Sequence, residues 1–472
     1  MPSLSLRQPT TLRASRSFKA RRRTELGLLI AASVIVVAMY VLMILGNTAK
    51  VPTNVLPFLV VILLLGGAAH IANRIYAPNA VAVVLPIAFL LNGIGYVMIA
   101  RIDLAIVRPG GQAFAPLQAG WTAIGVGAYI LTLVVVRRSR DLDRYRYLLL
   151  AGGVVLLLLP LVPHFGQNIQ GARLWVHVGS VRFQPVEIAK IVLCIFFASY
   201  FAEKRELLTI PTARFGNRLV LDPRPLVPIV LAWLFAIGVM SLEHDIGFSA
   251  LLFTLFIGML WVTTGRTGYL VLGAVLFGVG AYFSGRYLSQ TNIRVQDWLD
   301  PWKFASGSGR QLVQSWYALG SGGIGGSGLG LGQSAYLLYP TPNTDFIFAV
   351  IGEEMGLLGS TMLVVAFVLL VGTGLRIAQV ARSEFARLTA VGLTLIIGFQ
   401  AFFIIGGVVR ILPLTGITLP FVAYGGSALV ANYVLIAVLM RISDEGGAAV
   451  DAADQAQWEK SEERRERLLS GG

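Results

Sequence analysis

The sequence has little charge and almost no cysteine. Only 13% of its 472 residues are charged, against roughly 25% in a soluble chain. Hydrophobic residues make up 56%, and the mean hydropathy is +0.73. These values exclude an ordinary soluble enzyme, a disordered protein and a coiled coil. The single cysteine, Cys194, excludes a disulfide framework and a cysteine-based zinc or iron–sulfur site. Four scattered histidines disfavour a histidine metal cluster.

Long apolar runs take the place of the missing charge. About twelve segments approach the ~20 apolar residues that are needed to cross a bilayer core. We therefore predict an all-α polytopic integral membrane protein. The expected spans are 26–46, 54–72, 79–99, 117–136, 147–163, 186–202, 225–242, 246–263, 267–284, 346–374, 387–409 and 425–441.

Basic residues predict the orientation. Lys and Arg outnumber Asp and Glu by 38 to 24, and with the N-terminus inside most of them fall in inner segments such as RRSRDLDRYR (137–146). Because cytoplasmic loops are rich in basic residues, the polar ends 1–24 and 442–472 are expected to be cytoplasmic tails. Topology and contact with anionic lipid then explain the net charge of +14. No nucleic-acid partner is expected.

Two predicted outer segments, 164–190 and 243–247, set ionisable groups against apolar sequence. Glu187 and Lys190 are three apart, so on a helix they share a face. They are either a self-neutralising pair or functional groups. Arg173 carries a planar fork that suits phosphate oxygens. Asp245 could pair with a basic residue, bind a cation or order a site.

The predicted outer loop 285–345 is too long for a simple connector. Its stretch SGGIGGSGLGLGQS offers backbone N–H groups that could cradle phosphate, or glycines that only form tight turns. The loop ends at Asp345, which is either a cap or first-turn carboxylate of the next helix or a general base. Within that helix, at least one of Glu353 and Glu354 must be paired or protonated.

Prolines and glycines interrupt the apolar stretch 410–427. Irregular backbone at membrane depth is tolerated only where protein buries it or where it lines a cavity, so we predict a re-entrant segment. The outer side then combines Asp345, a Gly-rich loop and several cations. This combination suits an anionic, lipid-linked substrate such as a diphosphate. The cations are Arg173, Lys190, Arg294 and Arg410.

Five motifs resemble the SEDS family (shape, elongation, division and sporulation), the FtsW/RodA/SpoVE glycosyltransferases of bacterial cell-wall synthesis. They follow the family's order and spacing. Two positions depart from its pattern: Ala423, where Ser is usual, and Ile404, near a frequent Asn. The motifs are FQPVEIAK (183–190), EHDIGFS (243–249), RVQDWLDP (294–301), TDFIFAVIGEEMGLLG (344–359) and LPLTGITLPFVAYGGSALVAN (412–432).

The resemblance implies a family core at 101–441, with extra N-terminal spans in 25–100, most like an actinobacterial RodA that serves cell shape. It implies that lipid II is polymerised on the outer face of the cytoplasmic membrane. A GlcNAc 4-hydroxyl attacks C1 of the donor, a β-1,4 linkage forms, and undecaprenyl diphosphate leaves. Membrane lipids and a class B penicillin-binding protein, a transpeptidase, are the expected partners.

The resemblance also implies roles for single residues. Asp345 aligns with the family's catalytic base. The candidate substrate-binding residues are Arg173, Glu187, Lys190, Asp245, Arg294 and Arg410. Lys190 could instead pair with Glu187, or with Asp345 and hold the pKa of that carboxyl low. A divalent cation, Mg²⁺ or Mn²⁺, could assist the leaving diphosphate, although no ligand cluster identifies it.

Two rival functions share the same sequence features. A flippase or transporter for lipid-linked precursors would also have a cavity and a broken helix, but would favour internal repeats and charges near the bilayer midplane. A non-catalytic scaffold that recruits a transpeptidase would not need Asp345. Lipid II translocation that survives Asp345→Ala would favour the transporter.

Overall fold

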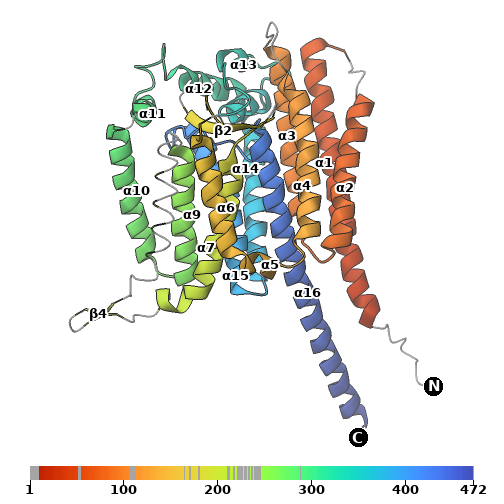
Figure 1. Cartoon of the computed structure of the whole chain (residues 1–472). Coiled ribbons are helices and arrows are strands. Elements are labelled where there is room, and N and C mark those ends of the chain that lie inside the picture. The colour runs from red at the N-terminus through yellow and green to blue at the C-terminus, as the bar shows by residue number, and fades with distance from the viewer. Residues whose placement is uncertain are drawn as a thin grey trace.

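The protein is a bundle of long helices with short elements at both ends of the bundle (Figure 1). The computed structural model describes residues 10–50, 55–106, 113–163, 165–169, 172–178, 181–209, 213–215, 218–220, 246–287 and 289–470, together with residues 227, 231, 234 and 238. Our statements on the structure concern these residues.

Ten of the described helices are long and apolar enough to cross a membrane. The expected span 147–163 is a shorter apolar helix, α6 (Arg146–Leu158) continued by the 3₁₀ turn η1 (Leu159–Leu161), and most of 225–242 lies outside the described residues. The ten are α1 (Thr10–Thr48), α2 (Val55–Tyr76), α3 (Val84–Ala105), α4 (Phe114–Val135), α7 (Pro185–Thr209), α9 (Ile246–Thr264), α10 (Gly268–Tyr287), α14 (Ile347–Gln379), α15 (Glu384–Val408) and α16 (Gly426–Ser470).

The two ends of the bundle differ. One end, here named the loop face, carries the small helices α11 (Ser289–Leu299), α12 (Arg310–Gly322) and α13 (Ser334–Leu337) (Figure 1). At the opposite end, named the tail face, lie α5 (Ser139–Arg144) and the protruding ends of α1 and α16. The segment expected to be a long outer loop is therefore about half helical.

Two small antiparallel sheets depart from the all-helical prediction. At the loop face, β1 (Gly166–Ile169), β2 (Ala172–Val178) and β3 (Val181–Phe183) form a sheet in that order. A hairpin of β4 (Ala213–Phe215) and β5 (Arg218–Val220) lies at the tail face. These strands have three to seven residues, too few for the alternation of polar and apolar side chains to stand out beside long apolar spans.

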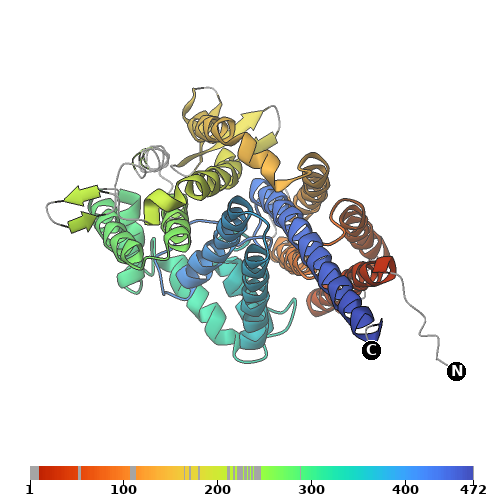
Figure 2. The same cartoon turned by 90° about the horizontal axis from the view of Figure 1, so that it is seen from below.

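Burial is uneven across the bundle. Helices α7, α15 and the apolar part of α16 are mostly buried, whereas α10 at one edge and α2 at the opposite edge expose most of their surface (Figures 1 and 2). The exposed side chains of α10 are largely Leu, Val, Phe and Tyr. Apolar exposure on this scale fits a surface that faces lipid.

The predicted re-entrant segment is irregular and buried. Residues 409–425 form no regular element, and Ile417, Phe421 and Val422 are almost inaccessible. A side chain on Gly95 of α3 would meet the Val422 carbonyl oxygen at 2.4 Å, so α3 lies directly against this segment. Protein therefore surrounds the part of the segment from Ile417 to Ala423, as irregular chain in a membrane requires, whereas residues 409–411 are exposed. Its depth in the bilayer stays a prediction.

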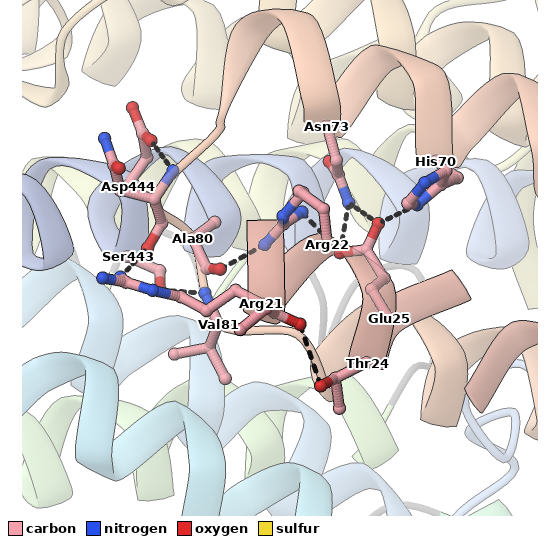
Figure 3. A network of polar contacts seen from close by, with 12 residues as sticks. Arg21, Arg22, Thr24, Glu25, His70, Asn73, Ala80, Val81, Ser443 and Asp444 are labelled. Atoms are coloured by element: carbon pink, nitrogen blue, oxygen red, sulfur yellow. Dashed lines mark hydrogen bonds and ion pairs between the residues drawn. The ribbon is translucent and has the colours of Figure 1, made fainter. Parts of the chain in front are cut away.

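A polar network at the tail face holds α1 and α2 to the rest of the bundle (Figure 3). Glu25 of α1 is fully buried, and its carboxylate contacts Arg22 at 2.5 Å and His70 of α2 at 2.7 Å. Asn73 of α2 donates to both of its oxygens, at 3.2 and 3.3 Å. Arg22 also donates to the Ala80 carbonyl, just before α3. Glu25 therefore joins α1 to α2, and its partner Arg22 joins α1 to the turn that precedes α3.

The same network reaches α16. Asp444 accepts from the Asn79 amide at 2.7 Å, and Ser443 accepts from the Val81 amide at 2.9 Å. Arg21 of α1 forms an ion pair with Asp451. The N-terminal helices are thus fixed to the chain's last helix by contacts between residues more than three hundred positions apart.

We predict that Glu25→Ala destabilises the protein strongly. Removing one partner of a buried ion pair leaves the other charge uncompensated, which costs about 3–5 kcal/mol. Thermal unfolding in detergent should show a clear drop in Tm. The control is Glu203→Ala, because Glu203 pairs with Arg146 and Lys204 in a half-exposed cluster, where such pairs contribute about 0–1 kcal/mol. Equal losses in the two variants would contradict a buried anchor.

Candidate active site

Asp345 lies at the loop face, immediately before α14. The helix begins at Ile347, its N-cap is Phe346, and no side chain caps it. The capping explanation for Asp345 is therefore wrong. Two hydrogen bonds hold the segment that leads into Asp345. Gln311 of α12 donates to the Leu338 carbonyl at 2.7 Å, and the Tyr424 amide donates to the Asn343 carbonyl at 2.9 Å.

The Asp345 carboxyl is half-buried and forms no hydrogen bond or ion pair with any described residue. Burial raises its pKa to about 6, and the positive charge of Arg294 opposes that rise. An ion pair with Lys190 was expected to hold the pKa of Asp345 low, but this pKa is raised. A carboxyl with a pKa near 6 is mostly ionised at neutral pH and is well matched to accept a proton there.

Arg294 of α11 is bonded to the irregular segment, and its positive charge acts on the Asp345 carboxyl. Its guanidinium donates to the Thr415 carbonyl at 2.8 Å. Gly416 has a φ of +76°, and a side chain there would approach the guanidinium at 3.3 Å. Arg294 therefore combines a structural bond with a charge that acts on the candidate base.

Arg410 begins the irregular segment and faces α11 and α12. Its guanidinium donates to the carbonyls of Trp298, at 3.0 Å, and Leu299, at 2.7 Å. It also lies 5.2 Å from the ring centre of Trp316, a cation–π distance. In return, Trp298 donates to the Arg410 carbonyl at 3.1 Å. These contacts give Arg410 an evident role in holding α11 in place.

Glu187 and Lys190 form a fully buried ion pair in the first turns of α7, with 2.5 Å between their charged atoms. The structure thus decides among the partners considered for Lys190 in favour of Glu187. The ammonium also lies 5.7 Å from the ring centre of Phe248 in α9. The second Glu187 oxygen has no hydrogen-bond partner among the described residues, so the pair keeps one acceptor unused.

Two sequence-predicted residues cannot be placed in this geometry. Arg173 belongs to strand β2, but its side chain lies outside the described part of the chain, and Asp245 lies outside it altogether. Trp175 pairs with Gln167 across β1 and β2. The sheet brings the backbone at Arg173 to the loop face, where Asp345 also lies (Figure 1).

Sequence reasoning missed Arg101 of α3. It is buried and donates to Glu354 of α14 at 2.8 Å and to the Gly332 carbonyl at 2.5 Å. The expectation that Glu353 or Glu354 must be paired is thereby confirmed. The available signal was an arginine inside an apolar span, because such a charge requires a partner.

The Gly-rich loop donates to these carboxylates instead of presenting its amides to solvent. Gly330 donates to Glu354 at 2.8 Å, and Gln333 donates to Glu353 at 2.9 Å. Ser334 contacts Glu353 through both its amide and its hydroxyl. These amides are therefore not free to cradle phosphate. The glycines permit close approach: at Gly326 the φ is +86°, and a side chain would meet the Glu354 carbonyl at 2.2 Å.

The described residues offer no cluster of metal-ligating side chains. Within the described residues, no three side chains from His, Cys, Asp and Glu gather closely enough to hold an ion. The described part of the site offers one carboxylate, Asp345, with no described hydrogen-bond partner.

The chain is similar to proteins of known family. Residues 81–447 match the profile of the FtsW/RodA/SpoVE family of cell cycle proteins. The peptidoglycan glycosyltransferase RodA of Mycobacterium tuberculosis (strain H37Rv) is 39% identical over 426 residues, 90% of each chain. A probable peptidoglycan glycosyltransferase FtsW of Geobacter metallireducens is 32% identical over 76% of this chain and 94% of that protein.

A solved structure from work on polymerization and crosslinking by a peptidoglycan synthase complex has the same fold. Its TM-score is 0.59 at 23% identity, over 76% of this chain and 96% of that chain. The profile match spans most of the helices, the irregular segment and Asp345, and leaves α1 and α2 before it. The chain therefore belongs to the FtsW/RodA/SpoVE family of cell cycle proteins.

Proposed function

We propose that this protein is a peptidoglycan glycosyltransferase that polymerises lipid II into glycan strands for cell elongation. The observation that carries the proposal is Asp345, a half-buried carboxyl with a pKa of about 6 and no described hydrogen-bond or ion-pair partner. The loop face would be the outer face of the cytoplasmic membrane, with both termini in the cytoplasm.

In the proposed reaction, Asp345 removes the proton from the acceptor's 4-hydroxyl group. The oxygen attacks C1 of the donor sugar, and a new C–O bond forms as the bond from C1 to the diphosphate oxygen breaks. Undecaprenyl diphosphate leaves with the electron pair. The α-linked donor becomes a β-1,4-linked unit, since the attack comes from the opposite side. Asp345 then returns its proton to solvent.

Cations near this site would stabilise the charge that develops on the diphosphate. Arg294 contributes a charge close to Asp345, although one of its nitrogens already bonds to Thr415. Arg173 on β2 is the proposed bidentate phosphate ligand. Lys190 and Arg410 have partners within the protein, so we propose that they act mainly by holding α7 and α11. We propose that Asp245 and Glu187 help to order the substrate-binding side of the loop face.

The proposal extends to partners. The similar solved structure comes from a peptidoglycan synthase complex, and we propose that this chain also assembles with a class B penicillin-binding protein. The donor's lipid tail would remain in the bilayer. Mg²⁺ or Mn²⁺ would be held by the oxygens of the leaving diphosphate and would neutralise part of its developing charge.

One assay separates this function from its rivals. Purified protein in liposomes is given lipid II, with and without a transpeptidase partner. Glycan strands from the wild type establish polymerisation. Translocation of lipid II without strands would favour a flippase, and the absence of both would favour a scaffold.

We predict that Asp345→Asn lowers the polymerisation rate by about 10²–10⁴-fold, because that is the usual contribution of a general base. The variant should still elute normally in gel filtration, since the Asp345 carboxyl has no described hydrogen-bond partner. Asp141→Asn, at an exposed position on α5 at the tail face, is the matched control and should retain full activity. A normally folded Asp345→Asn protein with full activity would eliminate Asp345 as the base.

We also predict a pH profile set by Asp345. The base must be ionised, so kcat/KM should rise with pH and level off above about 6, falling about tenfold per unit below that value. Arg294→Gln removes the charge that lowers this pKa, so its acidic limb should move to higher pH. Arg310→Gln, at an exposed position on α12, should leave the midpoint unchanged. An Arg294→Gln profile that coincides with the wild type would refute the coupling.

A further inference from the structure

A cavity lies among the first four helices, apart from the candidate active site. Its volume is about 250 Å³, and its walls come from α1, α2, α3 and α4. Asp345 does not line it. The side chains that define its shape include Val36, Tyr40, Phe58, Val61, Phe89 and Ala119.

The cavity lies between helices that are long and apolar enough to cross a membrane, and it begins near the loop face. Its upper wall is a row of aromatic rings: Phe58 lies 4.3 Å from Tyr40 and 5.2 Å from Tyr96, between ring centres. Phe58 belongs to the first turn of α2, and Leu65 lines the cavity two turns further along that helix. At 1.5 Å per residue, the cavity therefore extends about 10 Å along α2, a helix long and apolar enough to cross a hydrocarbon core about 30 Å thick.

The walls select an apolar ligand. Polar lining is confined to the two tyrosines, Asn92 and Thr122. The Asn92 amide donates to Thr122 at 3.2 Å and to Tyr433 of α16 at 3.0 Å, so its donors are already engaged within the protein. No charged side chain lines the cavity. The Asn92 side-chain oxygen lacks a described partner and can accept a hydrogen bond, but it cannot neutralise a charge. A charged group would therefore lose its hydration here without adequate compensation, whereas a hydrocarbon chain would not.

The size and position of the cavity exclude bulkier occupants. A partner helix is about 10–12 Å wide with its side chains and does not fit a partly open space of about 250 Å³ between four helices. Its wall on the membrane side is α2, which is mostly exposed, and Val61 lines the cavity while about half of its surface is accessible. A lipid chain from the surrounding bilayer can therefore reach it past a single helix.

The cavity is part of the folded structure, because its walls are fixed at both ends. The Glu25 network holds α1 and α2 to α3 and α16 at the tail face (Figure 3). The aromatic row holds α1, α2 and α3 together near the loop face. Helices held in this way lose little further conformational entropy when a chain enters between them.

We propose that this cavity binds one acyl chain of a phospholipid from the leaflet next to the loop face. Half of the cavity is made by α1 and α2, which precede the family match at residues 81–447. It is therefore a site for a structural lipid that stabilises the packing of the extra helices. Tyr96 lies at the upper wall, where its hydroxyl can donate to an ester carbonyl, a group that an isoprenoid diphosphate lacks. The proposal is independent of the glycosyltransferase reaction.

The test is to fill the cavity and count bound lipids. Full-length protein is equilibrated with phosphatidylglycerol in detergent, washed, and weighed by native mass spectrometry. Ala119→Phe places a ring in the cavity, and this variant should carry one phospholipid fewer than the wild type. Ile124→Phe is the control: it adds a ring on the same helix at a side chain that is 54% exposed, and it should keep the wild-type number.

Phosphatidylglycerol should also raise the Tm of the wild type and of Ile124→Phe but not that of Ala119→Phe. If Ala119→Phe fails to fold, the smaller Ala119→Leu serves in the same comparison. Equal lipid numbers in the wild type and the filled variant would overturn the proposal, as would a wild type that retains no phospholipid. Displacement of the phospholipid by equimolar undecaprenyl phosphate would also overturn it and would reassign the cavity to an isoprenoid chain.

Discussion

The buried carboxylates of α14 are the interaction on which the rest of the loop face depends. Glu353 and Glu354 lie in a membrane-spanning helix, where an unpaired charge is costly. They are satisfied by Arg101 and by amides of the Gly-rich loop. This requirement folds the loop back onto the first turns of α14. Because the same loop leads into Asp345, the charges inside the helix also determine where the candidate base lies.

Two glycines make this contact possible. Gly356 interrupts α14 with a φ of +66°, and a side chain there would meet the Gly326 amide at 2.3 Å. Past that break, the amides of Leu357 and Leu358 donate to the carbonyls of Gly323 and Ile324, at 2.9 and 3.1 Å. The helix thus exchanges some of its own hydrogen bonds for bonds to the loop. Backbone groups remain paired, as they must in an apolar medium.

Much of this arrangement could be predicted from the sequence. Spans were recognisable because apolar length alone determines them, and Asp345 was recognisable because an isolated carboxylate precedes an apolar run. The irregular character of residues 409–425 followed from its prolines and glycines. Each of these signals is local, so a single stretch of chain contains it.

What the sequence could not provide are partners that are distant along the chain. Arg101 and Glu354 are separated by 253 positions, and Asn79 and Asp444 by 365. Lys190 had several possible partners, and only the packed structure selects Glu187. Arg410 was expected to face substrate because it is a cation on the predicted outer side, yet α11 offers it two carbonyl groups. The distribution of charged residues along the sequence predicts on which side of the membrane a residue lies. It does not predict which atoms its side chain contacts.

α1 and α2, which lie outside the family match, need contacts of their own to stay attached to the bundle. In a bilayer, apolar helix surfaces gain little by leaving lipid for one another, so association needs close packing or polar contacts. α1 and α2 have the polar contacts at the tail face, through Glu25. Towards the loop face they contact α3 through the aromatic row, but a cavity among the first four helices leaves some packing contacts unmade. A lipid chain in that space would restore them, and the attachment of these helices would then depend on the membrane itself.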